Sequence, residues 1–161
     1  MINRRDLIAI LAAAAAPADY KLRFFSEDEN RLIDELAEMI IPADERSPGA
    51  RAAKVSLYID LVVSSSEPRK QAEWKTQLAA FDRAGSAPFL KLSANDRAAL
   101  LHRLAKAESD PSSGAERFFA AMKRMTLAGY YTSEIGYRRE FERKSPEMLA
   151  EFPGTCRDGR L

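Results

Sequence analysis

The sequence predicts an all-α protein, with a single small domain of about five helices and an irregular C-terminal tail. Apolar residues recur at helical spacing in several stretches, and no stretch of useful length alternates as a half-buried strand would. Glycine is scarce, with 7 in 161 residues, whereas alanine, leucine, glutamate and arginine, which favour helices, are plentiful. A chain of this length suits one domain.

The first helix is predicted to begin after Ser26. Ser26 and Glu29 have the spacing of a capping box, in which each side chain accepts a hydrogen bond from the other residue's backbone N–H group. Phe24 and Phe25 stand just before this start and can pack back onto the helix. Pro42 ends the helical pattern, because proline cannot donate the hydrogen bond that a helix interior requires.

Start and stop signals predict the later helices. One spans roughly residues 51–65, and the next begins at Pro68, since proline is tolerated at a first helical position. A third opens at Ser93, and a last long helix follows the turn at residues 110–114. Residues 138–144 are highly charged and predict a short helix. The positions of these helices expected to face the core are Val55, Leu57, Tyr58, Ile59, Leu61, Val62, Trp74, Leu78, Phe81, Leu100, Leu101, Leu104, Phe118, Met122, Met125 and Gly129.

The first eighteen residues have the three parts of a signal peptide. Arg4 and Arg5 precede an alanine-rich apolar run of ten residues, which is shorter than the roughly 20 that a bilayer-spanning helix needs. Ala16 and Ala18 provide the small-residue cleavage region. The paired arginines indicate that residues 1–18 are a twin-arginine export signal. An ordinary secretory signal and an alanine-rich first helix are the alternatives. Residues 19–161 are then the helical body, and the periplasm is the expected location.

Charge and motif content exclude several function classes. Net charge is +1, and loss of residues 1–18 removes two of 25 basic and one of 24 acidic residues, so the body is formally neutral and no nucleic-acid partner is expected. His102 is the only histidine, and Cys156 is the only cysteine; Cys156 can be a free thiol or pair with another chain. No glycine-rich nucleotide loop, haem-attachment motif or metal-ligand cluster is present in the sequence. We therefore assign no catalytic, cofactor-binding or metal-binding residue and do not expect an enzyme.

Two segments are not explained by core packing or helix capping alone. One is Ile40-Ile41-Pro42-Ala43-Asp44 with Ser47-Pro48-Gly49-Ala50, and the other is residues 126–137, which hold three tyrosines. Tyrosine is enriched at protein interfaces, although tyrosines covering the core edge at a helix end would explain the second segment equally well. The candidate residues for a partner interface are Pro42, Asp44, Pro48, Gly49, Tyr130, Tyr131, Glu134, Gly136 and Tyr137.

These segments carry a resemblance to a known family. Arg4-Arg5 with the alanine-rich run, Phe24-Phe25, the two proline-containing pieces at 40–50, Tyr58-Ile59-Asp60 and the stretch 129–137 occur in this order. In this set the chain resembles the gluconate 2-dehydrogenase subunit 3 family, the small or gamma subunits of membrane-associated flavoprotein dehydrogenases. The pair Ile-Ile-Pro-Ala-Asp and Ser-Pro-Gly-Ala is its most specific part.

The resemblance implies a division of labour among subunits. A large partner, a GMC-type dehydrogenase, would carry FAD and oxidise a sugar, a sugar acid or a related alcohol. A cytochrome c subunit would hold haem c and pass electrons to the respiratory chain, which would associate the complex with the membrane. The small subunit would bind the large one in the cytoplasm and bring it through the twin-arginine translocase. The alternative function is a stand-alone periplasmic helical protein that binds a small molecule.

Replacing Arg4 and Arg5 by lysines is expected to keep the chain in the cytoplasm, because the translocase receptor reads the arginine pair itself. Fractionation of cells followed by immunoblotting measures this. An ordinary secretory signal tolerates lysine in its positive region. Undiminished periplasmic accumulation of the lysine variant would therefore contradict the twin-arginine prediction.

Overall fold

The computed structural model describes residues 20–45 and 47–141, and within them the protein is all-α, as predicted. Five of the helices in these described residues have ten residues or more. An isolated antiparallel bridge between Ala43 and Pro48 is the one extended pairing in the described residues. The elements are α2 (Glu27–Ile40), α3 (Gly49–Ala52), α4 (Val55–Ser64), α5 (Pro68–Asp82), the 3-10 turn η2 (Phe89–Lys91), α6 (Ala94–Lys106), α7 (Gly114–Thr132) and α8 (Glu134–Phe141).

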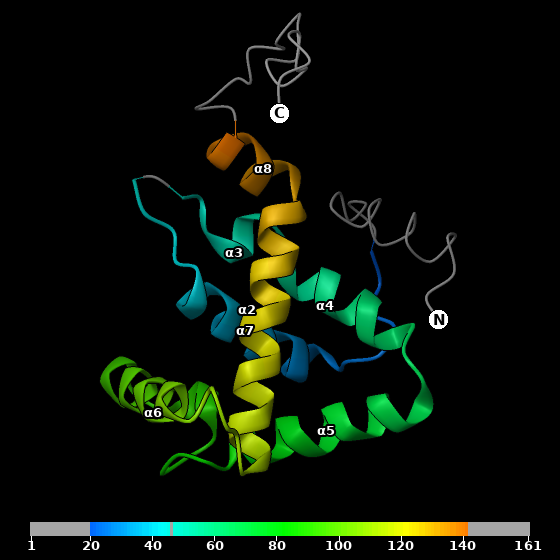
Figure 1. Cartoon of the computed structure of the whole chain (residues 1–161). Coiled ribbons are helices and arrows are strands. Elements are labelled where there is room, and N and C mark those ends of the chain that lie inside the picture. The colour runs from blue at the N-terminus through cyan, green and yellow to red at the C-terminus, as the bar shows by residue number, and fades with distance from the viewer. Residues whose placement is uncertain (1–19, 46, 142–161) are drawn as a thin grey trace, which may run out of the picture.

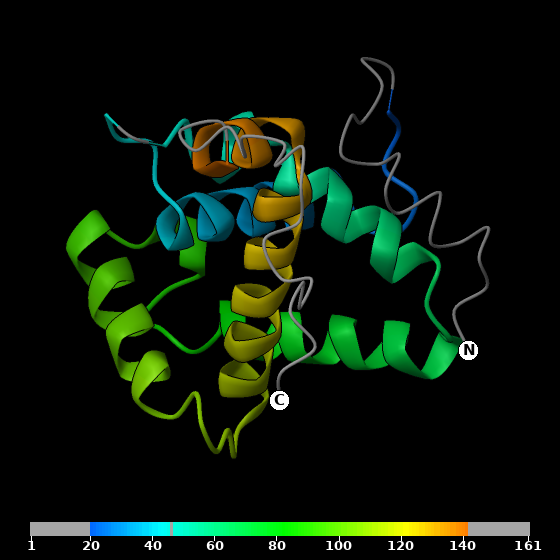
Figure 2. The same cartoon turned by 45° about the horizontal axis from the view of Figure 1, so that its top comes forward.

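Helix α7 is the central element of the fold. It packs against α2, α4, α5, α6 and α8, and it runs through the middle of the molecule in both views (Figures 1 and 2). Helices α4 and α5 extend to one side of α7, and α6 lies on the other side (Figure 1). Helices α3 and α8 lie together at the end of the molecule where α7 finishes.

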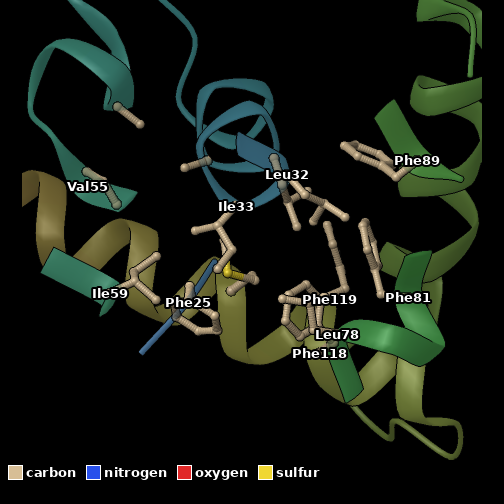
Figure 3. Packing of buried hydrophobic residues seen from close by; sticks show 14 of the residues in the cluster. Phe25, Leu32, Ile33, Val55, Ile59, Leu78, Phe81, Phe89, Phe118 and Phe119 are labelled. Carbon is tan, nitrogen blue, oxygen red and sulfur yellow. The ribbon is translucent and has the colours of Figure 1, made fainter. Parts of the chain in front are cut away.

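The core is a continuous cluster of aromatic and aliphatic side chains between these helices (Figure 3). Phe118 of α7 is fully buried, and its ring centroid lies 5.1 Å from that of Phe81 and 5.6 Å from that of Trp74. Phe81 in turn contacts Phe89 of η2, with a centroid distance of 5.0 Å. Offset and edge-on ring contacts of this kind add to the free energy gained by burying the rings. The predicted face of Trp74, Leu78 and Phe81 is therefore confirmed as a core face, with Trp74 partly exposed at its edge.

The helix starts follow the predicted capping chemistry. Ser26 Oγ accepts a hydrogen bond from the Glu29 N–H group at 3.2 Å, and the Glu29 carboxylate accepts one from the Ser26 N–H group at 2.8 Å. Pro68 is the first residue of α5, as expected. A second capping box, between Ser113 and Glu116, begins α7 where the sequence predicted only a turn. Hydrogen bonds from Ser113 and Ser112 lower the pKa of Glu116 to about 2.

Two of the predicted helices differ in the structure. The helix expected over 51–65 is divided into α3 and α4 by a turn in which Lys54 has a φ of 54°. The residues around this turn are good helix formers, so the periodicity did not reveal it. The buried stripe of α4 is also rotated, because Val63 is buried where Val62 was expected. The short helix expected over 138–144 begins earlier, at Glu134, and its described part ends at Phe141.

Several predictions fall outside the described residues. The signal peptide with Arg4, Arg5, Ala16 and Ala18, the C-terminal tail and Cys156 all lie there. Within residues 20–45 and 47–141, no helix is long and apolar enough to cross a bilayer.

The central position of Phe118 predicts a large effect on stability. Phe118→Ala is expected to lower the free energy of unfolding by about 3–5 kcal/mol, because it removes a fully buried ring and leaves a cavity. Leu127 lies on the same helix but is 38% exposed, so Leu127→Ala serves as the control, with an expected change within about 0.5 kcal/mol. Chemical denaturation followed by circular dichroism measures both, and equal losses would contradict this description of the core.

Candidate functional site

The two segments singled out in the sequence meet at one end of the molecule. The connector between α2 and α3, described over residues 41–45 and 47–48, lies at the same end of the molecule as the C-terminal end of α7 (Figure 1). The side chains of Ser47 and Tyr130 share a hydrogen bond of 2.8 Å between their hydroxyl oxygens, across 83 positions of sequence. This contact brings the Ser-Pro-Gly-Ala piece and the tyrosine-rich piece into one structural unit.

The carboxylate of Glu38 shapes the connector from the end of α2. It accepts hydrogen bonds from the backbone N–H groups of Ala43, at 3.0 Å, and Arg51, at 2.8 Å. Gly49 lies against it with a φ of +83°, and a Cβ atom there would be 2.6 Å from Glu38 Oε1. Only glycine combines this backbone conformation with so close an approach. Glu38 and Gly49 therefore fix the path of the connector.

Two further glycines fix the position of the α7 and α8 ends. A Cβ atom on Gly129 would lie 2.7 Å from the Tyr58 ring of α4, and one on Gly136 would lie 2.0 Å from the carbonyl oxygen of Tyr130. The Ser133 hydroxyl donates to that same carbonyl oxygen at 2.6 Å and accepts from the Gly136 N–H group at 3.0 Å. The chain can therefore turn sharply from α7 into α8 and remain packed against it.

The candidate interface residues separate into two groups. Tyr131 is 45% and Tyr137 57% exposed, and Pro42, Asp44 and Glu134 are exposed as well. We call these five residues the motif end. Pro48 is partly buried, whereas Gly49, Tyr130 and Gly136 are buried, so these three hold the connector and helix ends in place and do not offer side chains to a partner.

A second candidate feature is the attachment of the N-terminal segment, residues 20–25, to Asp60 by hydrogen bonds. We call this attachment the anchor. The Asp60 side chain is fully buried in α4. Its Oδ2 atom accepts hydrogen bonds from the Tyr20 hydroxyl at 2.7 Å and the Arg23 N–H group at 2.8 Å. Its Oδ1 atom accepts from the N–H groups of Phe24, at 3.0 Å, and Phe25, at 2.8 Å. A carboxylate can accept all four bonds because it has no proton to donate.

These bonds explain how the Asp60 carboxylate can be buried although no ion pair to it is found in the described part of the chain. Burying an isolated carboxylate is costly, and hydrogen bonds to its charged form offset that cost. The Tyr20 hydroxyl is protonated at neutral pH and can donate this bond, and burial and the bond to Asp60 raise its pKa further. Lys75 of α5 holds the segment from the other side, with its Nζ atom 4.7 Å from the ring centroid of Phe24 and 5.4 Å from that of Phe25.

The role of Asp60 was not predicted from the sequence. A signal was present, since an acid stands on the buried side of an apolar helix next to Ile59. Periodicity treats such an acid as an interruption, whereas its four donors come from a segment 35–40 positions earlier in the chain. A long-range contact of this kind cannot be read from local spacing.

The described part of the surface also has hollows that could hold a ligand or a partner side chain. An apolar groove of about 290 Å³ lies between α2, α6 and α7, lined by Met39, Ile40, Ala98, Leu101, His102, Ala105, Phe119 and Lys123. His102 is exposed at this groove. A hollow of about 480 Å³ lies against Gly85 and Arg103, and one of about 270 Å³ lies between α5 and α7. No group of three or more potential metal ligands occurs within the described ranges.

The protein is a small helical domain in which the two segments singled out in the sequence form one surface, the motif end. The family model for gluconate 2-dehydrogenase subunit 3 matches residues 27–145, which include both converging segments. The chain belongs to the gluconate 2-dehydrogenase subunit 3 family, as its motifs predicted, and it is accordingly an accessory subunit of a dehydrogenase complex. No curated protein and no solved structure matches the chain.

Asp60→Asn is expected to loosen the N-terminal segment and to lower the free energy of unfolding by about 2 kcal/mol or more, because the amide NH₂ group would face donors. Tyr20→Phe removes a single bond and is expected to cost about 1 kcal/mol. Brief trypsin digestion with mass spectrometry measures the loosening as faster cleavage after Lys21 and Arg23. Cleavage of Asp60→Asn at the wild-type rate would show that Asp60 does not anchor the segment.

Proposed function

We propose that this chain is the non-catalytic small subunit of a periplasmic flavin-dependent dehydrogenase of the gluconate type. It binds a GMC-type large subunit that carries FAD, assists its folding and accompanies it through the twin-arginine translocase. A cytochrome c subunit with haem c is the proposed electron acceptor, and the complex associates with the membrane through its other subunits. The partner oxidises a sugar or a sugar acid.

The observation that carries the proposal is the convergence of the family's motif segments on one exposed surface. The partly buried hydrogen bond between Ser47 and Tyr130 and the close packing at Gly49, Gly129 and Gly136 hold this end in a fixed shape. Around it, Tyr131 and Tyr137 present large aromatic side chains to solvent. A preformed surface with exposed aromatic anchors suits protein binding, because little conformational freedom is lost on association.

The anchored N-terminal segment supports the export part of the proposal. If residues 1–18 are the signal, only Asp19 separates them from Tyr20, which bonds to the buried Asp60 carboxylate. The export address is then attached to the helical body at a fixed place on α4. A body that has not folded cannot assemble this anchor, since Asp60 and its donors are far apart in sequence. The twin-arginine pathway carries folded cargo, so an address fixed in this way suits it.

The apolar groove between α2, α6 and α7 favours the second candidate, a small-molecule binding protein. Its volume of about 290 Å³ lies just below the range for ligand pockets, roughly 300–1,000 Å³, so it would suit only a small ligand. An accessory subunit needs the motif end to bind its flavoprotein partner, whereas a small-molecule binding protein does not. Retention of a large flavoprotein on the chain therefore separates them.

Replacing Tyr131 and Tyr137 together by alanine is expected to weaken binding of the co-expressed flavoprotein at least about tenfold, since exposed aromatic anchors carry much of an interface's affinity. Affinity capture of the tagged full chain, followed by flavin absorbance and titration of the complex, measures this.

Leu90→Ala provides the matched control, because Leu90 is 37% exposed on η2, away from the motif end. Its complex should be unchanged. Because the Tyr131 ring lies 5.4 Å from that of Tyr130, melting curves of both variants confirm that they are folded at the temperature of the binding measurement. Wild-type affinity of the double tyrosine variant would exclude the motif end as the binding surface, and flavin bound tightly by the isolated chain would overturn the accessory role.

A further inference from the structure

One side of α7 is covered by no described helix along its whole length (Figure 1). We call this side the outer face of α7. The exposed residues on this face form one stripe, because they are separated by about one or two whole turns of the helix. Arg117 and Arg124 lie toward α5, and Leu127, Ala128 and Tyr131 continue the stripe to the motif end. The face therefore changes from cationic to apolar and aromatic along its length.

The cationic part of this face surrounds a hollow between α5 and α7. The hollow has a volume of about 270 Å³, and its lining includes Lys70, Trp74, Gln77, Arg117 and Arg124. Glu73 is the one acid in the lining, and it pairs with Arg69 at 3.3 Å.

The three cations of this hollow, Lys70, Arg117 and Arg124, are held by no ion pair within residues 20–45 and 47–141. Arg117 donates to the carbonyl oxygen of Ser112 at 2.7 Å, which leaves its charge uncompensated. Within the described residues, no carboxylate forms an ion pair with Lys70, Arg117 or Arg124. The sequence from Arg117 to Ser133 contains no aspartate or glutamate. In a body whose total charge is close to zero, this hollow is a local concentration of positive charge.

We infer that this hollow binds carboxylate side chains of the large subunit, so that the partner interface runs from the motif end along the outer face of α7. The inference rests on the proposed function and adds the chemistry of the partner's surface. Arginine guanidinium groups suit carboxylates because two parallel N–H groups can donate to both oxygens. The partner would place acidic side chains at Arg117, Arg124 and Lys70, and apolar ones over Leu127 and Tyr131.

The composition of the face favours a protein over an anionic lipid surface. Lipid-binding patches typically gather about four to eight lysines or arginines on one surface, whereas this hollow has three cations and continues into an aromatic stripe. That stripe is continuous with Tyr131 of the motif end. A single extended partner surface covers both parts without a second binding event.

The test uses the full chain co-expressed with its flavoprotein and a double charge reversal, Lys70→Glu with Arg124→Glu. The reversed hollow would repel carboxylates, so affinity for the flavoprotein should fall at least about tenfold. Raising the salt from about 50 to about 500 mM should weaken the wild-type complex, and it should weaken the variant complex much less. Lys91→Glu, an exposed reversal on η2, is the control and should bind as the wild type does.

The possible outcomes separate the inference from the proposed function. A complex that forms normally, with the double variant binding as tightly as wild type, overturns the inference and leaves the proposed function standing. Failure of the wild-type chain to retain any flavoprotein overturns both. Binding to phosphatidylglycerol vesicles that is lost in the double variant, with the flavoprotein complex unaffected, would assign the hollow to a membrane and also overturn the inference. Unchanged melting temperatures confirm that the variants are folded.

Discussion

The four hydrogen bonds to the buried Asp60 carboxylate are the interaction on which the N-terminal half of the structure depends. They join the segment that begins at Tyr20 to the middle of α4, and they place the Phe25 ring in the core. Without them, the charge on Asp60 would have to be exposed or neutralised, and α4 could not keep its buried face. The same bonds fix where the predicted export signal leaves the body, so one interaction serves both stability and the proposed export.

The motif end depends on a different constraint, which is close backbone approach. Glycine at positions 49, 129 and 136 allows a carboxylate, a ring and a carbonyl oxygen to lie where a Cβ atom would collide with them. These contacts leave little freedom for the connector and for the turn between α7 and α8. The exposed tyrosines are thereby held on a rigid support, and a rigid support reduces the entropy that a partner must overcome on binding.

Local signals predicted the helices well, and long-range contacts could not be predicted from them. The capping box at Ser26, the start at Pro68 and the core face of α5 depend on neighbours a few residues apart, and the structure confirms them. The anchor at Asp60 depends on donors 35–40 positions earlier in the chain. The left-handed turn at Lys54 lies among good helix formers, so the periodicity gave no sign of it. For the site, the sequence identified both segments and their family but not their contact, and it did not distinguish exposed tyrosines from the buried Tyr130.

We therefore propose that this accessory subunit offers its partner one continuous surface, from the connector past α8 and along the outer face of α7. Amide hydrogen exchange on the full chain, alone and in complex with its flavoprotein, tests this most directly. We predict that binding slows exchange in residues 41–45 and 124–137 and leaves α6 unchanged. Protection confined to α6 and the apolar groove, with no change at the motif end, would contradict the account.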